Sequence, residues 1–401
     1  MKELLYQFNP WWEGSFHSSS VVRPRYLDRL FGSLESKEIV FMVGLRRVGK
    51  TTLMHQIIEK LLLNHKPEHV LYVSLDHPLF DETSILDVLK EYRTIHGLPR
   101  KERVFLFFDE VHLKEGFERD LKMLYDMENV KVYASGSSSL LLQHKGSFLT
   151  GRQRSIMIEP LDFAEFLSFR GVSIKNSEDY LLDKYAEDYL RVGGIPEYVL
   201  RGEDGYLREL VENIIYKDIV GRYGIKNPDL LRKLFFMLAE RVGSRFTYSK
   251  LANVLGLSVD TVKQYAYYLE ETFLVYLVSK HASSMNESIY APKKVYLADN
   301  GIRNSFIGFK DLGSLAENQV FLKIKDMGKV SYYFESDREI DFIVNKTAIE
   351  VKYKDKITEE DKKTLKDAKA GRKIIVSKSG KHENGLEVVP LAEFLYKEQQ
   401  A

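Results

Sequence analysis

Two kinds of apolar pattern alternate along the first 140 residues of the chain. Short continuous apolar runs, rich in β-branched and aromatic residues, predict buried strands at residues 39–43, 69–75, 104–108 and 130–134. Segments whose apolar residues recur at helical spacing predict helices at residues 53–62, 85–92 and 117–127. Strands that alternate with helices in this way are typical of a parallel α/β sheet.

A glycine-rich segment joins the first predicted strand to the first predicted helix. Residues 44–51, G-L-R-R-V-G-K-T, match the P-loop pattern G-x-x-x-x-G-K-[ST]. The glycines let the backbone curl so that N–H groups point at phosphates, and the helix N-terminus adds its positive dipole end. We expect Lys50 to bridge the β- and γ-phosphates of ATP and Thr51 to ligate Mg²⁺. The predicted nucleotide-binding residues are Gly44, Arg47, Val48, Gly49, Lys50, Thr51 and Thr52.

Two carboxylates directly follow the strand predicted at residues 104–108. A buried parallel strand would deliver Asp109 and Glu110 to the carboxyl edge of the sheet, where ligands bind. We expect Asp109 to hold Mg²⁺ and Glu110 to orient and polarise the attacking water. The same pair also follows strands that have no catalytic role, but its position after a P-loop favours the catalytic interpretation.

Two further residues complete the predicted catalytic set. Ser137 follows the strand at residues 130–134 and is expected to reach the γ-phosphate or the attacking water; the alternative is a helix N-cap. Arg152 is expected to act as an arginine finger that stabilises the γ-phosphate across a subunit interface. The alternative for Arg152 is an ordinary surface arginine.

Several short motifs, taken together, resemble a widespread archaeal and bacterial family of AAA-like ATPases. They are G-L-R-R-V-G-K-T-T (44–52), L-D (75–76), F-F-D-E (107–110), S-G-S-S-S (135–139), G-R (151–152), E-P-L-D-F-A-E-F (159–166) and G-G-I-P-E-Y (193–198). In that family the ATPase core precedes a C-terminal domain of unknown function. The resemblance covers nearly the whole chain, and it alone implies adenine rather than guanine as the base.

The segment at residues 163–223 has a helical pattern. AAA-like proteins carry a small helical lid over the nucleotide, and this segment is long enough to form one. The glycines at 193 and 194 interrupt the pattern, either as an interdomain hinge or as a tight loop.

The next segment has the element order of a winged helix. Helices are predicted at residues 229–241 and 247–255 and after Ser258, which can cap the third, and strands at 273–278 and 293–297 flank a polar loop at 279–288. In a DNA-binding winged helix, the outward side chains of the third helix enter the major groove. The candidate DNA contacts are Lys263, Gln264 and Tyr267. Protein docking is the alternative, because Asp260, Glu270 and Glu271 on the same helix would repel phosphates.

The last hundred residues hold a second set of candidate catalytic residues. Alternating strands at residues 339–344 and 348–353, joined by a turn at 345–346, would place Asp341 opposite Glu350, with Lys352 on the same face. This D…E-x-K set resembles the PD-(D/E)xK restriction-endonuclease-like nucleases, in which the carboxylates hold Mg²⁺ and the lysine assists. Glu317, on a helix predicted at 312–325, would complete a second metal site. The alternatives are a solvated sheet face or a remnant that keeps only the fold. A charged helix is predicted at 354–373.

Composition limits the choice of cell compartment and partner. The 401 residues carry a net charge of +1 with 29% charged residues, so any basic nucleic-acid surface must be local. The absence of cysteine suits an intracellular, cytoplasmic protein, and there is neither a signal-peptide pattern nor an apolar run long enough to span a membrane.

We therefore predict an α/β protein of four parts: an AAA-like P-loop ATPase domain at residues 1–165, a helical lid at 166–225, a winged helix at 226–298 and a restriction-endonuclease-like domain at 299–401. The leading hypothesis is a homo-oligomeric Mg-ATPase that acts on DNA. One alternative is an ATP-gated metal-dependent nuclease. The other is a nucleotide switch whose C-terminal half docks a protein partner.

Overall fold

The computed structural model describes residues 1–18, 20–137, 149–174, 180–282, 284–380 and 386–397. The chain forms two compact units, Met1–Glu159 (unit 1) and Pro160–Ala401 (unit 2). Ser138 and Ser139 of the predicted S-G-S-S-S motif lie outside the described residues. Within the described part of the chain, no helix has the length and apolar character needed to cross a membrane.

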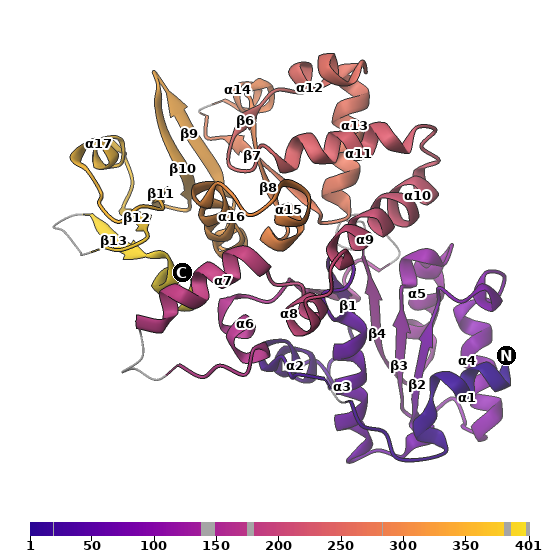
Figure 1. The fold of residues 1–401 in the computed structure, drawn as a ribbon. Coiled ribbons are helices and arrows are strands. Elements are labelled where there is room, and N and C mark those ends of the chain that lie inside the picture. The colour runs from indigo at the N-terminus through magenta and orange to yellow at the C-terminus, as the bar shows by residue number, and fades with distance from the viewer. Residues whose placement is uncertain (19, 138–148, 175–179, 283, 381–385, 398–401) are drawn as a thin grey trace. The chain divides into compact units, whose positions relative to one another are not determined.

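Unit 1 is built on a sheet of five parallel strands in the order β2-β3-β4-β1-β5 (Figure 1). The strands are β1 (Ile39–Val43), β2 (Val70–Ser74), β3 (Val104–Asp109), β4 (Val130–Gly136) and β5 (Gln153–Met157). The first four confirm the predicted strands. The sequence analysis missed β5, because this edge strand is only partly buried and has no continuous apolar run.

Helices α3 (Lys50–Leu62), α4 (Ile85–His96) and α5 (Phe117–Met127) connect the strands and confirm the predicted helices. Crossovers between parallel strands are right-handed, so α3 packs with α2 (Pro24–Phe31) on one face of the sheet and α4 with α5 on the other. The N-terminal segment, which begins with α1 (Lys2–Phe8), covers the β2 edge. There the side-chain amide of Asn9 bonds both backbone groups of Tyr72, at 2.7 and 2.9 Å.

Unit 2 begins with helices and continues with alternating helices and strands. Its helices are α6 (Phe163–Phe169), α7 (Leu182–Val192), α8 (Pro196–Arg201), α9 (Tyr206–Asn213), a π-helix (Ile214–Val220), α10 (Gly221–Tyr223), α11 (Pro228–Ala239), α12 (Tyr248–Leu255), α13 (Val259–Glu271), α14 (Met285–Tyr290), α15 (Asn300–Ile307), α16 (Leu312–Ile324), α17 (Glu359–Asp367) and α18 (Leu391–Tyr396). The helices predicted before, within and after the winged-helix segment are therefore present. The charged helix predicted at 354–373 is only the nine residues of α17.

The strands of unit 2 form one sheet in the order β13-β12-β11-β10-β9-β7-β8-β6 (Figure 1). They are β6 (Arg245–Phe246), β7 (Val275–Lys280), β8 (Lys293–Leu297), β9 (Ser331–Glu335), β10 (Arg338–Val344), β11 (Thr347–Lys352), β12 (Arg372–Ser377) and β13 (Glu387–Pro390). The predicted hairpin of β7 and β8 forms, although the loop between them contains the short helix α14. Parallel pairing of β7 with β9 joins this hairpin to the C-terminal strands, which the sequence analysis had assigned to a separate domain.

The two glycines at 193 and 194 form a closely packed corner within unit 2. The carboxylate of Asp299 accepts hydrogen bonds from the N–H groups of Gly194 and of Ile302. A Cβ atom on Gly193 would lie 2.3 Å from an Asp299 oxygen, and one on Gly194 would lie 2.3 Å from the Leu161 carbonyl oxygen. Of the two alternatives predicted for these glycines, the tight loop therefore agrees with the packing.

Candidate functional site

The P-loop lies between β1 and α3 in unit 1, and a side chain is disfavoured at each of its two glycines for a different steric reason. A Cβ atom on Gly44 would lie 2.1 Å from the Ile158 carbonyl oxygen, while Gly49 has a φ of +95°. Arg47, with a φ of +65°, adopts a conformation that costs an L-residue free energy and is concentrated at functional sites. The loop backbone is therefore bent as the glycine pattern predicts.

Lys50 opens α3 and is 4% exposed. Its Nζ atom donates to the carbonyl oxygens of Gly44 and Leu45, both at 2.9 Å, so the ammonium lies against the inner side of the loop. Gly49, the N-cap residue, supplies no side-chain hydrogen bond to the first turn of α3. A helix N-terminus with this kind of cap and a lysine at its first position is suited to binding anions.

The C-terminal residue of β3, Asp109, is 3% exposed and contacts the P-loop helix. Its Oδ2 atom accepts hydrogen bonds from the Thr51 hydroxyl at 2.5 Å and from the Tyr72 hydroxyl at 2.9 Å, and Oδ1 accepts from the Ser135 hydroxyl. Burial and the Asp109 charge both raise the pKa of Tyr72, which therefore stays protonated and remains a donor. Among the described residues, the side chains that donate to Asp109 are the neutral hydroxyls of Thr51, Tyr72 and Ser135. The converging oxygens of Thr51 and Asp109 are hard ligands that fit Mg²⁺.

Glu110 and Ser137 are linked through a residue that the sequence analysis missed. One ring nitrogen of His112 lies 3.4 Å from a Glu110 carboxylate oxygen, and the other lies 3.4 Å from the Ser137 hydroxyl. The backbone of Glu110 is in the left-handed region, with a φ of +53°. The signal that could have identified His112 is its position two residues after Glu110, in D-E-V-H.

Arg152 lies at the N-terminal ends of the strands, whereas the P-loop of its own chain lies at their C-terminal ends. It precedes Gln153, which pairs with Ile39 at the start of β1, whereas the P-loop follows the end of β1. A strand rises about 3.3 Å per residue, so about 13 Å of strand separates the two positions. Arg152 forms a 3.0 Å ion pair with Asp126. A contact between Arg152 and the phosphates of its own chain is therefore excluded, and the finger remains a prediction for a neighbouring copy.

Arg23 is a second residue that the sequence analysis missed, and it is 3% exposed. Its guanidinium donates to the carbonyl oxygen of the P-loop residue Val48 at 2.9 Å and to that of Glu159 at 3.0 Å. The same group stacks on the Tyr26 ring, 4.5 Å from the centroid. Arg23 thus fixes the P-loop to the end of the strand beside it.

The predicted nuclease residues come together in unit 2, with a lysine among them that was not predicted. The pairing of Phe342 with Ile349 places Asp341 opposite Glu350, as predicted. The Nζ atom of Lys294, on β8, lies 2.8 Å from Asp341, 3.0 Å from Glu317 and 2.7 Å from Glu339. We call Lys294 and these three carboxylates the Lys294 cluster.

Next to this cluster, the Lys352 ammonium forms an ion pair with a Glu350 carboxylate oxygen at 2.6 Å. Burial raises the pKa values of Glu317 and Glu350, and the negative charge of Asp341 raises both further. In the described ranges of the chain, no group of three or more His, Cys, Asp or Glu side chains is arranged to hold a metal ion. The second metal site predicted at Glu317, Asp341 and Glu350 therefore stays a prediction, and in this structure the Lys294 ammonium lies between Glu317 and Asp341.

The candidate DNA contacts lie on α13, which Ser258 caps as predicted. Lys263 is 3.5 Å from Asp260, Gln264 donates to the Tyr268 hydroxyl, and the Tyr267 hydroxyl donates to Glu271 at 2.9 Å. Glu271 is 3% exposed, and Glu270 accepts a hydrogen bond from the Leu277 N–H while burial raises its pKa to about 7. Two of the three acidic residues expected to repel phosphates are thus turned inward.

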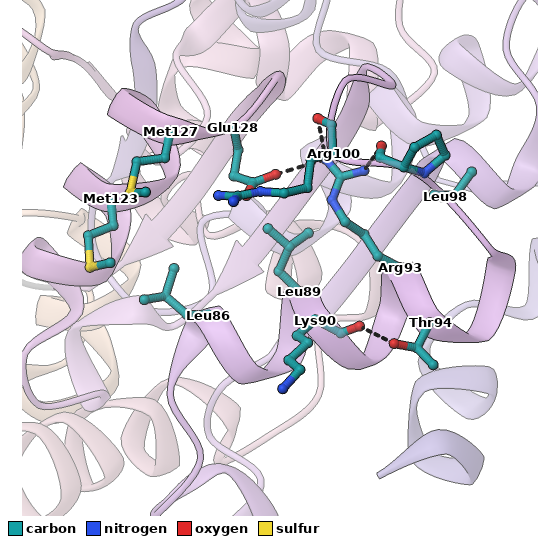
Figure 2. Close-up of a pocket in the computed structure, with 11 residues that line it drawn as sticks. Leu86, Leu89, Lys90, Arg93, Thr94, Leu98, Arg100, Met123, Met127 and Glu128 are labelled. Carbon is teal, nitrogen blue, oxygen red and sulfur yellow. Dashed lines mark hydrogen bonds and ion pairs between the residues drawn. The ribbon is translucent and has the colours of Figure 1, made fainter.

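A groove on unit 1 lies between α4 and α5 and has a volume of about 550 Å³ (Figure 2). Leu86, Leu89 and Met123 form its apolar part, and Glu128 bridges Arg93 and Arg100 at 3.2 and 2.7 Å. Glu128 precedes β4, so the groove lies toward the N-terminal ends of the strands, away from the P-loop. It plays no part in the nucleotide site.

Comparison with known proteins gives matches to two family models over different parts of the chain. Residues 36–167 match a family model described as an AAA domain, and residues 183–313 match one described as a domain of unknown function, DUF8612. An uncharacterized protein of Methanocaldococcus jannaschii is 28% identical and covers 90% of this chain and 85% of its own length. An uncharacterized protein of Haemophilus influenzae is 28% identical, with coverages of 81% and 84%.

Solved structures are similar to the chain only at a coarse level. The Aeropyrum pernix ORC1 protein in complex with DNA is 13% identical with a TM-score of 0.39, over 72% of this chain and 93% of its own. AMPPCP-bound DnaA from Aquifex aeolicus is 19% identical with a TM-score of 0.29, over 63% and 90%. Similarity at these scores carries no argument about function. What the matches establish is that the chain contains an ATPase-like AAA domain, followed by a domain of unknown function that also occurs in archaeal and bacterial relatives.

Proposed function

We propose that this protein binds Mg-ATP at the P-loop of unit 1, hydrolyses it, and uses the cycle to act on DNA through unit 2. The observation that carries the ATPase proposal is the contact of Thr51 with Asp109 beside the uncapped start of α3. Mg²⁺ held by these two oxygens would neutralise phosphate charge. Lys50 binds the phosphates, Glu110 accepts the proton of the attacking water, and Ser137 steadies the same water or the γ-phosphate.

Two surfaces of unit 2 support the DNA part of the proposal. The first is the outer face of α13, where Lys263 and Tyr267 are 54% and 44% exposed. The second is a hollow of about 620 Å³ beside β7 and α14, which we call the basic hollow. It is lined by Lys280, His281, Lys293 and Lys329. Cationic side chains around a hollow attract phosphates, and this attraction weakens as salt rises.

The proposal is tested by measuring ATP hydrolysis by the full chain in the presence of Mg²⁺. Each assay is run with and without double-stranded, single-stranded or branched DNA. We expect hydrolysis in every case, stimulation by at least one DNA, and no hydrolysis by Lys50→Ala. Lys60→Ala, which alters a lysine in the last turn of the same helix, is the matched control. Unchanged hydrolysis by Lys50→Ala would overturn the P-loop assignment, and hydrolysis indifferent to every DNA would overturn the DNA role.

Charge reversal would locate the DNA surface. Lys263→Glu tests α13 and Lys329→Glu tests the basic hollow, with Lys66→Glu on unit 1 as a control on an exposed lysine. The variant at the contact surface should weaken DNA binding for all sequences and lower the salt dependence of binding. Equal binding by all three would remove both surfaces from the proposal.

A protein-docking role for unit 2 is the second candidate, and one observation favours it. Helix α14 exposes three large apolar side chains: Met285, Ile289 and Tyr290 are 81%, 57% and 86% exposed. Apolar residues gathered on one short helix are typical of a protein contact rather than of a solvated loop. This candidate is preferred if DNA neither binds nor stimulates hydrolysis.

A further inference from the structure

Lys294 is the most completely surrounded cation of unit 2 for which the contacts are described. Its side chain is 1% exposed, and its ammonium contacts carboxylates from two different elements, Glu317 on α16 and Glu339 and Asp341 on β10. The ammonium donates hydrogen bonds to Glu317 at 3.0 Å and to Asp341 at 2.8 Å, and it forms an ion pair with Glu339 at 2.7 Å. All three carboxylates therefore lie within ion-pair distance of Lys294.

The carboxylates around Lys294 are held in place by further contacts. The Tyr296 hydroxyl donates to the same Glu317 oxygen at 2.6 Å. Gly243 leaves room for Glu317, because a Cβ atom there would lie 2.8 Å from the carboxylate. The second Asp341 oxygen accepts the Val351 N–H at 2.9 Å. The oxygens that face Lys294 are thus fixed by side-chain and backbone packing rather than by Lys294 alone.

A divalent ion and the Lys294 ammonium cannot share this position. Mg²⁺ requires oxygen ligands at about 2.0–2.1 Å, so an ion held between Glu317 and Asp341 would occupy the position of the Lys294 ammonium. Like charges a few Å apart in a buried site repel strongly. Removing one charge from a buried group of ions leaves its partners uncompensated and is destabilising, so Lys294 does not leave readily.

We propose that the Lys294 ammonium is a built-in cation that takes the place of a divalent ion among Glu317, Asp341 and Glu339. Unit 2 then binds no divalent ion among these three carboxylates. Instead, Lys294 joins β8, within the DUF8612 match, to Glu317 and to β10, which follow that match. Of the D…E-x-K residues, Asp341 contacts this internal lysine, while Glu350 pairs with Lys352.

This proposal is tested by titrating the full chain with Mn²⁺ in the absence of nucleotide. Binding is measured as the loss of the electron paramagnetic resonance signal of free Mn²⁺. Wild-type protein should bind no Mn²⁺ at the cluster, so Asp341→Asn should change nothing in its titration. Lys294→Met removes the ammonium at similar side-chain length and should gain one Mn²⁺ per chain, with a melting temperature that rises when Mn²⁺ is added. Adding Asp341→Asn to that variant should abolish the gain. Lys293→Met is the matched control, since Lys293 bonds Ser279 and Ser288 instead of the cluster.

Two results would overturn the proposal. One is wild-type Mn²⁺ binding that Asp341→Asn removes, which would make the cluster a metal site despite Lys294. The other is a folded Lys294→Met that binds no Mn²⁺. If Lys294→Met does not fold, Lys294→Met with Glu339→Gln removes one negative charge as well and keeps Glu317 and Asp341 as ligands, and the same outcomes apply. Because these measurements contain no ATP, their failure is distinct from failure of the ATPase proposal.

Discussion

The two units each bring a lysine and a strand-borne aspartate into one buried site, but the lysine contacts different oxygens. In unit 1, Lys50 bonds two backbone carbonyl oxygens, and the side chains that donate to Asp109 are neutral hydroxyls. In unit 2, the Lys294 ammonium bonds Asp341 itself, at 2.8 Å. The carboxylate of Asp109 thus keeps its charge for an added cation, whereas that of Asp341 is already paired.

On our proposals, this difference separates a site that takes up Mg²⁺ from one that is complete without it. Hydroxyl donors orient a carboxylate without cancelling its charge, while an ammonium at hydrogen-bond distance does both. The residue types alone, acid and lysine, are the same in the two places. The contact that the lysine makes therefore decides whether such a set can recruit Mg²⁺.

The largest effect is expected at the nucleotide site, for the arginine that a neighbouring copy would supply. If a neighbouring copy supplies Arg152, Arg152→Ala should lower kcat by about 10³-fold while sparing ATP affinity, because a finger acts on the transition state. The loss should appear only at protein concentrations at which the chain assembles. Arg154→Ala, an exposed arginine on the same strand, is the control. An equal loss at every protein concentration would contradict action in trans.

The same substitution in both sites gives the most direct comparison. Asp109→Asn should lower kcat/KM for Mg-ATP by about 10²-fold, because it removes several kcal/mol of metal-linked charge stabilisation. Asp341→Asn should leave hydrolysis within about twofold and instead lower the free energy of unfolding by about 1–3 kcal/mol, since it weakens the pairing of buried Lys294. Steady-state kinetics and urea unfolding separate the two. Loss of hydrolysis in both variants would mean that the two sites do not differ as described.

The smallest effect is expected at Asp299, a buried carboxylate that accepts hydrogen bonds from backbone N–H groups. Burial raises its pKa from 3.8 to about 6, although the hydrogen bond from Gly194 opposes this rise. The folded protein therefore binds this proton more tightly than the unfolded chain does. Its contribution to stability is present below the unfolded pKa and decreases by about 3 kcal/mol at most as pH rises through about 6.

Urea unfolding between about pH 4 and pH 7 measures this contribution. Asp299→Asn should show less loss of stability with rising pH than wild type, whereas the exposed carboxylate variant Asp229→Asn should keep the wild-type slope. If Asp299→Asn keeps that slope too, the backbone hydrogen bonds already hold Asp299 ionised.

Much of the fold could be predicted because it is encoded over short distances. The apolar runs that became β1 to β4, the P-loop between β1 and α3, and the Ser258 cap of α13 each depend on residues within a few positions of one another. The two-residue turn after Val344 likewise specified that Asp341 faces Glu350. Periodicity, capping and turn length are local properties, so sequence reveals them.

The features that were missed depend on distant pairings. Strand β5 has no apolar run, so only its pairing with β1 reveals it. The same pairing places Arg152 at the end of the strands that is far from its own P-loop. The pairing of β7 with β9 merged two predicted domains into one sheet. Neither pairing leaves a periodic signal, because an edge strand or a short parallel contact buries only a few side chains.

The sequence by itself therefore determined the order of the elements, the P-loop and which acids stand on neighbouring strands. Only the tertiary structure decided which cation each acid meets. Lys294 lies 47 residues from Asp341 and 23 from Glu317 along the chain, and sheet pairing brings them within 3.0 Å. The strength of an ion pair depends on distance and burial in space, and neither is set by separation along the sequence.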